Sequence, residues 1–188
     1  MQLFIKKHIN LSFKKSAEIT DFYRSLKIDY PKFFKMDNLS KLGFLASELI
    51  FKDEESRFVP REDLAIICFN RSSSLEADTL YQTTIQDNEN YFPSPSVFVY
   101  TLPNIVAGEI SIRNKLFGET SFYICKEFDE EQTFRTVNNA FQDQTTRSVL
   151  AAWVESFEEK QEVFMMLIET ETSDIIFSIE KIKELFNN

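Results

Sequence analysis

The run DLAIICFN, Asp63 to Asn70, most limits what this chain can fold into. Residues 64–69 are all apolar, and a polar residue stands at each end. An unbroken apolar run of this length is typical of a strand that is buried on both faces, because a strand with one wet face alternates apolar and polar residues. Such strands occur in parallel sheets that helices cover on both sides. The run therefore predicts an α/β protein.

Strand-like and helix-like segments alternate along the rest of the chain, which at 188 residues is long enough for one domain and short for two. We expect the other strands at 2–11, 121–128, 147–157 and 163–170, and helices at 16–26, 38–52, 73–86, 129–142 and 178–186. This alternation predicts a single α/β domain, 1–188, with a mostly parallel five-stranded sheet and helices on both faces.

Glycine is rare here, with only three residues in the chain. Gly43 interrupts an apolar stripe in the helix at 38–52, which Asp37 or Asn38 caps, so we expect close packing of a neighbour against it. The other two glycines lie in SPSVFVYTLPNIVAGEISIRNKLFG, residues 94–118. There we expect a helix capped by Thr101, with Gly108 allowing the close approach of another backbone and Gly118 ending the helix in the left-handed conformation. The expected inward stripe of this helix consists of Leu102, Ile105, Val106, Ile110 and Leu116.

Net charge is −9 and unevenly distributed, since residues 1–60 carry +3 and the remaining 128 carry −12. An acidic body disfavours nucleic-acid binding, which needs a clustered basic face. The first sixty residues offer either a modest basic patch or simply a solvated face, with these lysines: Lys6, Lys7, Lys14, Lys15, Lys32 and Lys35.

The N-terminal residues 1–15 hold an apolar run of only three residues before Lys6, too short for a signal peptide or for the roughly 20 residues of a membrane span. We expect an unexported, cytoplasmic protein without membrane contact. Cys68 and Cys125 lie in strand-like runs, which favours two reduced core cysteines over a disulfide. Metal-ligand spacings and phosphate-binding glycine loops do not occur, so we expect neither a metal site nor a cofactor.

Residues 94–118 also resemble the β-ketoacyl synthases, in a stretch where Ser-Pro and an aromatic residue lead into TLPN-x-x-AGE-x-(A/S)-I and a later glycine. The matching positions are Ser94, Pro95, Phe98, Thr101, Leu102, Pro103, Asn104, Ala107, Gly108, Glu109, Ile110, Ile112 and Gly118. The resemblance extends more weakly over residues 35–170. It implies that 1–188 is a β-ketoacyl synthase N-terminal-like domain, a single thiolase-like half with the element order βαβαβαββ.

The resemblance also implies where a nucleophile would stand. Ketosynthases take a Cys from the turn after the third strand, and nine residues beyond Gly118 this chain has Glu127, with Cys125 two positions earlier. The two further catalytic residues of the family come from a second half. The single histidine, His8, falls on the first predicted strand, where the family has no catalytic group. A thiol without a base or a positive field is a weak nucleophile, so the chain lacks a complete condensing site.

Two functions follow from these residues. The first is a non-catalytic ketosynthase-like subunit in fatty-acid, polyketide or aryl-polyene biosynthesis, paired with itself or with a full-length ketosynthase and open to contact with an acyl carrier protein. Its expected dimer interface contains Leu102, Ile105, Gly108, Phe122, Tyr123, Ile124 and Cys125. The alternative is a small acyltransferase or hydrolase that handles thioesters through Cys125 and an unidentified base. A free-standing homodimer with another task is also left open.

Overall fold

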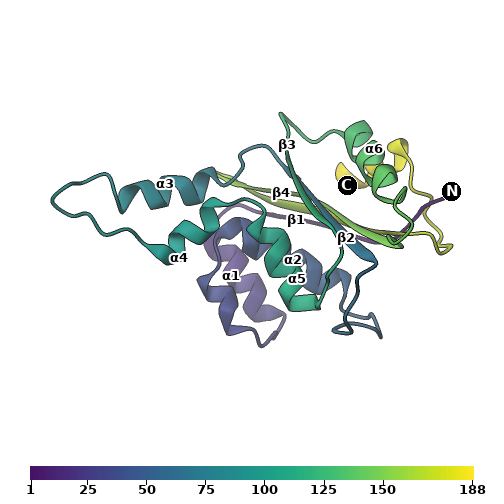
Figure 1. Cartoon of the computed structure of the whole chain (residues 1–188), viewed down its shortest axis with the longest axis horizontal. Coiled ribbons are helices and arrows are strands. Elements are labelled where there is room, and N and C mark those ends of the chain that lie inside the picture. The colour runs from purple at the N-terminus through teal and green to yellow at the C-terminus, as the bar shows by residue number, and fades with distance from the viewer.

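The structure, a computed structural model, describes residues 1–188 and is built around one five-stranded sheet between two layers of helices (Figure 1). The strands lie side by side in the order β1-β5-β4-β2-β3. Their bounds are Phe4–Phe13 for β1, Leu64–Asn70 for β2, Thr120–Ile124 for β3, Ser148–Phe157 for β4 and Lys160–Glu169 for β5. The α/β class and the βαβαβαββ order are confirmed.

The sheet is mixed, which corrects the expectation of a mostly parallel one. β2 is parallel to β3 and β4, whereas β5 is antiparallel to both β4 and β1. The cause is local, because only Glu158 and Glu159 separate β4 from β5, and a two-residue turn joins only antiparallel strands. Four strands therefore run in one direction and β5 runs against them.

Helices cover both faces of the sheet, as predicted. One face packs against α1 (Ser16–Ser25), the 3₁₀ helix η1 (Pro31–Lys35), α2 (Asn38–Ile50) and α5 (Ile105–Asn114). The other face packs against α6 (Glu130–Ala140) and α7 (Ile179–Phe186). All seven residues of β2 are buried. Its side chains alternate between the two cores, with Ile66 in one and Ile67 in the other, which confirms that this strand is buried on both faces.

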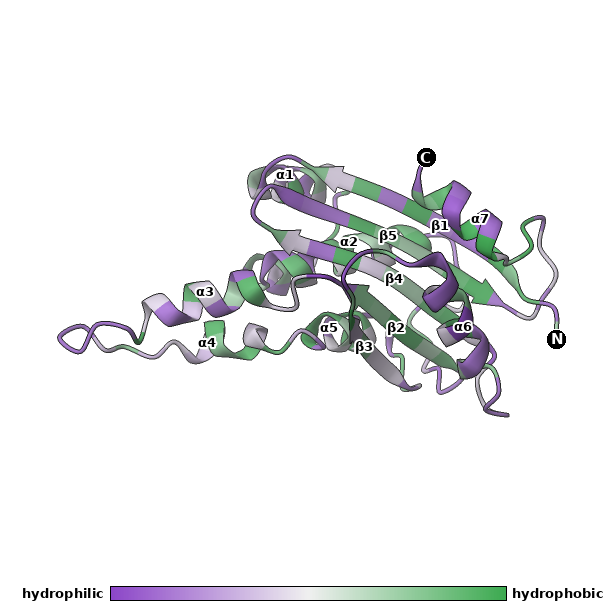
Figure 2. Ribbon diagram, turned by 90° about the horizontal axis from the view of Figure 1, so that it is seen from above, coloured by the Kyte–Doolittle hydropathy of each residue, from purple (hydrophilic) through white to green (hydrophobic).

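A separate arm projects beyond the end of the sheet (Figures 1 and 2). It consists of α3 (Leu75–Thr83), a loop, α4 (Pro95–Phe98) and the 3₁₀ helix η2 (Val99–Thr101), which leads back to α5. Tyr91 and Phe92 in the loop are 58% and 76% exposed. No helix of the protein has the length and apolar character that crossing a membrane requires.

The glycines behave differently from expectation at two of three positions. A Cβ at Gly43 would overlap a methyl group of Val106, so the predicted close packing is confirmed, with α5 as the neighbour. Gly108 has open space where its Cβ would stand, so the expected close approach there is wrong. Gly118 is not left-handed; it is needed because a Cβ would overlap the carbonyl of Leu64. Lys115 takes the left-handed position after α5.

The start of α5 also corrects the predicted cap. Thr101 belongs to η2, and its hydroxyl donates to the carbonyl of Phe98 instead of capping α5. The helix begins only at Ile105. Since Leu102 stands before it in extended backbone and is 51% exposed, Leu102 is not part of the inward stripe, whereas Val106 and Ile110 are fully buried.

Candidate functional site

The outer edge of β3 is the clearest unpartnered feature of the fold. β3 ends the sheet and pairs only with β2, so its outward N–H and C=O groups have no strand beside them. Tyr123 is 39% exposed and Ile124 is 61% exposed. An edge strand that carries exposed apolar side chains is a ready template for another strand. The sequence-based prediction of an edge in this segment is therefore confirmed as far as its position is concerned.

Exposed apolar residues continue from this edge along α4 and α5. Figure 2 shows α4, α5 and β3 following one another along one side of the molecule. We call this the edge surface and define it by Phe98, Val99, Leu102, Ile112, Phe117, Tyr123 and Ile124, which are between 39% and 67% exposed. Soluble monomers rarely expose so many large apolar side chains along one side, so the edge surface is a candidate interface.

The predicted interface residues divide into two groups. Leu102, Tyr123 and Ile124 belong to the edge surface, whereas Ile105 and Phe122 are half-buried and pack against the core. Gly108 and Cys125 are also partly buried. Sequence reasoning missed Ile112 and Phe117 as surface residues. The signal was available at Phe117, because an apolar residue placed between a helix end and Gly118 has little core to enter.

The expected nucleophile position lies in the turn between β3 and α6. Cys125 follows β3 directly, its N–H donates to the carbonyl of Asn70, and its thiol donates to Oε1 of Gln132 across 3.5 Å. Burial raises the pKa of the Cys125 thiol, so the thiol stays protonated at neutral pH. Glu127 is exposed in the same turn. The site thus offers no activated sulfur.

His8 lies far from this turn. It is exposed on β1, and β1 and β3 are the two opposite edges of the sheet. Four strand spacings separate these edges, which amounts to about 19 Å. The structure therefore does not bring Cys125 and the histidine together, and no cluster of three or more His, Cys, Asp or Glu residues could hold a metal ion.

The lysines of the first sixty residues do not form a free basic patch. Nζ of Lys6 lies 3.1 Å from Glu54 and 3.3 Å from Glu169, and Lys7 also contacts Glu54. Lys32 is paired with the buried Glu109 at 2.6 Å. The expectation of a basic patch is therefore wrong for half of its members. Lys14, Lys15 and Lys35 remain exposed.

Solved structures with a similar fold include ketosynthases and chain length factors. The ishigamide ketosynthase/chain length factor aligns with a TM-score of 0.67 and 15% identity over 93% of this chain and 64% of its own. The ketosynthase ApeO in complex with its chain length factor ApeC, from Xenorhabdus doucetiae, aligns with a TM-score of 0.63 and 13% identity over 92% of this chain and 81% of that one. A β-ketoacyl synthase from Burkholderia phymatum STM815 gives a TM-score of 0.57 and 11% identity over 89% of this chain and 59% of its own.

The sequence itself matches no protein-family profile and no curated protein. The chain spans just under two thirds of the length of the ishigamide protein, at 64%. Identities of 15% and below carry the fold without the activity. By its strand order, its element order and these alignments, the chain has the thiolase-like fold of ketosynthases and chain length factors.

Proposed function

We propose that the chain is a non-catalytic ketosynthase-like subunit that pairs with a ketosynthase through the edge surface. The observation that carries this proposal is the unpaired β3, with Tyr123 and Ile124 exposed on it. Backbone pairing along β3 supplies hydrogen bonds, and the apolar side chains of the edge surface supply burial. One of the solved structures of similar fold is a ketosynthase in complex with its chain length factor, which supports a partner of the same fold.

The chemistry of the nucleophile turn supports a non-catalytic role. Condensation needs a thiolate and donors for the oxyanion and enolate that form. The raised pKa of Cys125 works against a thiolate, and the only histidine lies at the opposite edge of the sheet. Nothing in the structure favours the alternative of an acyltransferase or hydrolase based on Cys125. The pathway class that we propose is fatty-acid, polyketide or aryl-polyene biosynthesis, in which the partner supplies the catalytic residues.

The test is co-expression of the tagged chain with each ketosynthase of its own genome, followed by affinity purification and light scattering. We expect one ketosynthase to co-purify at equal stoichiometry. Ile124→Lys should abolish this complex, because it places a charge in the apolar edge and leaves the fold intact at a position that is 61% exposed. Ile176→Lys is the matched control, since Ile176 is 55% exposed and bridges to Phe4 at the opposite side of the sheet.

Two outcomes would contradict the heterodimer. Wild-type chain that elutes alone in the presence of every ketosynthase lacks the proposed partner, and a homodimer in light scattering would assign the edge surface to a second copy. A complex that survives Ile124→Lys would show that β3 is not the interface.

Contact with an acyl carrier protein is a weaker part of the proposal. Carriers are acidic, so they would need the cations that remain unpaired at the surface, which are Lys14, Lys15 and Lys35. We expect binding of a carrier to weaken strongly with added salt. Affinity that stays constant from low to high ionic strength would remove this contact from the proposal.

A further inference from the structure

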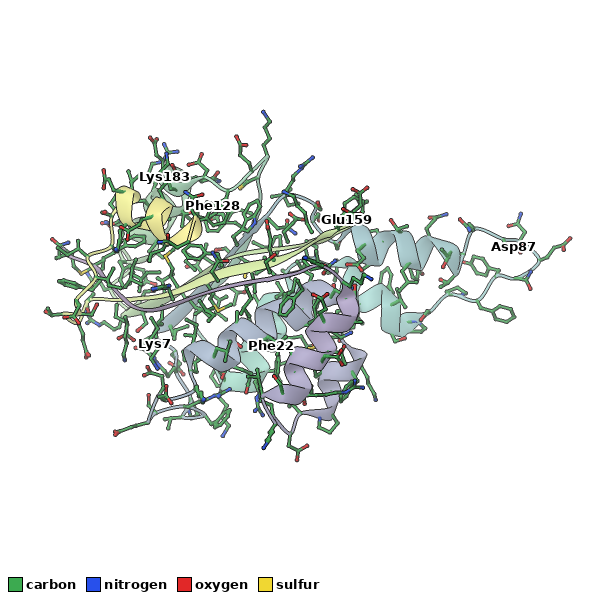
Figure 3. The ribbon with its side chains drawn as sticks, turned by 180° about the vertical axis from the view of Figure 1, so that it is seen from behind. Lys7, Phe22, Asp87, Phe128, Glu159 and Lys183 are labelled. Atoms are coloured by element: carbon green, nitrogen blue, oxygen red, sulfur yellow. The ribbon has the colours of Figure 1, made fainter.

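A wide cleft of about 1300 Å³ lies at the end of the sheet where β2 and β4 finish and the turn after β3 begins. Open α/β sheets bind their ligands at this end, outside the carboxyl ends of parallel strands. Phe128 and Glu159, which line the cleft from the turn after β3 and from the β4–β5 turn, are labelled in Figure 3. The cleft is a property of this chain alone and needs no partner to complete it.

Glu155 lies in this cleft with half of its carboxylate unsatisfied. Its side chain on β4 is only 2% exposed. Oε2 accepts hydrogen bonds from the N–H groups of Arg71 and Ser72, at 2.8 and 3.2 Å. Oε1 is buried and has no hydrogen-bond partner. A buried acceptor of this kind is uncommon in folded proteins because it loses water without replacing it, so it points to a donor that completes the site.

A second carboxylate faces the first across the sheet. Glu162 on β5 is the direct register partner of Glu155, and residues directly opposite in an antiparallel pair share one face. Oε1 of Glu162 accepts a hydrogen bond from the indole N–H of Trp153, at 3.1 Å. Like charges opposite one another destabilise a sheet. A cation between or beside them would remove that repulsion.

The cations that line the cleft do not supply this charge. Arg71, Lys126 and Lys160 stand against six carboxylates in the lining, and none of the three forms an ion pair in the structure. The carboxylates are also not gathered into a metal-binding cluster. The missing charge is therefore not one that the chain provides for itself, and it is not a metal ion held by these residues.

Aromatic rings complete the surroundings. The ring of Phe128 meets that of Trp153 edge-on with centroids 5.9 Å apart, and it stacks on Phe186 at 3.9 Å. Rings beside carboxylates suit an organic cation, since the ring faces attract positive charge and the rings also cover an apolar segment. A metal ion or an inorganic cation would gain nothing from them.

We propose that this cleft binds a small organic amine, a molecule with an ammonium or guanidinium group next to an apolar segment. The N–H groups donate to Oε1 of Glu155, the charge offsets the Glu155–Glu162 pair, and the apolar segment lies against Trp153 and Phe128. The inference does not rest on the proposed pairing with a ketosynthase.

The experiment uses agmatine as the probe and the single tryptophan, Trp153, as the reporter. Titration of the full-length chain should change the fluorescence of Trp153 saturably. Glu155→Gln should weaken binding about tenfold or more, because a charge-assisted hydrogen bond is lost. Glutamine still accepts from the N–H groups of Arg71 and Ser72, so the fold is retained, which circular dichroism checks. Tetramethylammonium, a cation with no N–H group, should bind about tenfold more weakly than agmatine.

Glu171→Gln is the matched control, because it makes the same change in net charge at an exposed position outside the cleft. It should leave the agmatine midpoint unchanged. The proposal is overturned by the absence of a saturable signal in wild type up to about 10 mM agmatine, which is weaker than ordinary specific recognition. It is equally overturned by equal midpoints for wild type and Glu155→Gln, or by an equal loss in Glu171→Gln, which would mean that only net charge matters.

Discussion

The hydroxyl of Tyr100 donates a hydrogen bond to the buried carboxylate of Glu109, with 3.3 Å between Oη and Oε1. Tyr100 belongs to η2 at the base of the arm, and Glu109 lies in α5 and is only 4% exposed. Lys32 of η1 pairs with the other oxygen of Glu109 at 2.6 Å. Burial and the charge of Glu109 raise the pKa of Tyr100, so the phenol remains a donor at every ordinary pH. This contact holds the arm against the body.

Removing the Tyr100 hydroxyl should loosen the arm. Tyr100→Phe leaves one oxygen of a buried carboxylate without its donor, which costs about 1–3 kcal/mol of folding free energy. We expect a lower melting temperature and faster amide exchange in residues 95–101. Tyr91→Phe is the matched control, because Tyr91 is 58% exposed, and it should change neither measurement. Equal exchange in both variants would mean that the contact does not hold the arm.

Two glycine-to-alanine substitutions in helices should act in opposite directions. At Gly43 a Cβ would overlap Val106, whose branched side chain has little freedom to move, so Gly43→Ala should destabilise the protein by about 1–3 kcal/mol. At Gly108 nothing lies within 4 Å of the added Cβ, so Gly108→Ala should stabilise it by about 0.5–1 kcal/mol through helix propensity. Urea unfolding measures both. The same sign for both variants would contradict the packing of α2 against α5.

Asp37 should make stability depend on pH with an unusual sign. It caps α2 by accepting from the N–H of Ser40 at 3.0 Å, yet burial raises the pKa of its carboxyl to about 6, with Glu76 adding to the rise. Because the native state holds this proton between about pH 4 and 6 and the unfolded state does not, stability falls as pH rises through that window.

Asp37→Asn isolates the effect, since asparagine is an equally good cap. We expect the variant and wild type to have similar stability near pH 4, and the variant to be more stable by up to about 2 kcal/mol at pH 7.5, a figure reduced for partial exposure of the side chain. Chemical denaturation at the two pH values measures the difference. A difference that is constant across pH would show that the Asp37 carboxyl has an ordinary pKa.

Alkylation should distinguish the two cysteines and test the enzymatic alternative. Burial raises the pKa of Cys68 to about 12 and that of Cys125 by less, so neither is a thiolate at pH 7.5. Iodoacetamide should label Cys125 several-fold more slowly than free cysteine, and Cys68 only after unfolding. Mass spectrometry follows both, with Cys125→Ser as the control that leaves Cys68 alone. Labelling of Cys125 faster than free cysteine would restore it as a candidate nucleophile.

Local pattern was enough to predict much of the fold. The apolar run at 64–69 determined that β2 is covered on both faces, because six consecutive apolar side chains point alternately to two sides of a sheet and all need burial. The helix at 38–50 and its cap followed from spacing and from the hydrogen bond that Asp37 offers to Ser40. The residues around β3 indicated an edge, which the strand order confirms.

Where a prediction concerned the neighbour of a residue, the same patterns failed. Gly43 and Gly108 are both helical glycines in apolar stretches, yet only Gly43 faces another helix. Gly118 is required by the carbonyl of Leu64, which is 54 positions away in the chain. A single residue's identity records that space is limited, but the atom that limits it belongs to a distant segment.

By itself, the sequence determined the α/β class, the alternating elements, the buried strand and the segment that forms the open edge, because these depend on the order of side chains within a few residues. Only the tertiary structure decided that β5 runs against its neighbours, that Glu155 faces Glu162, that Tyr100 reaches Glu109 and that His8 lies across the sheet from Cys125. These relationships depend on which strands pair and in what register, and that choice is made by burial over the whole domain.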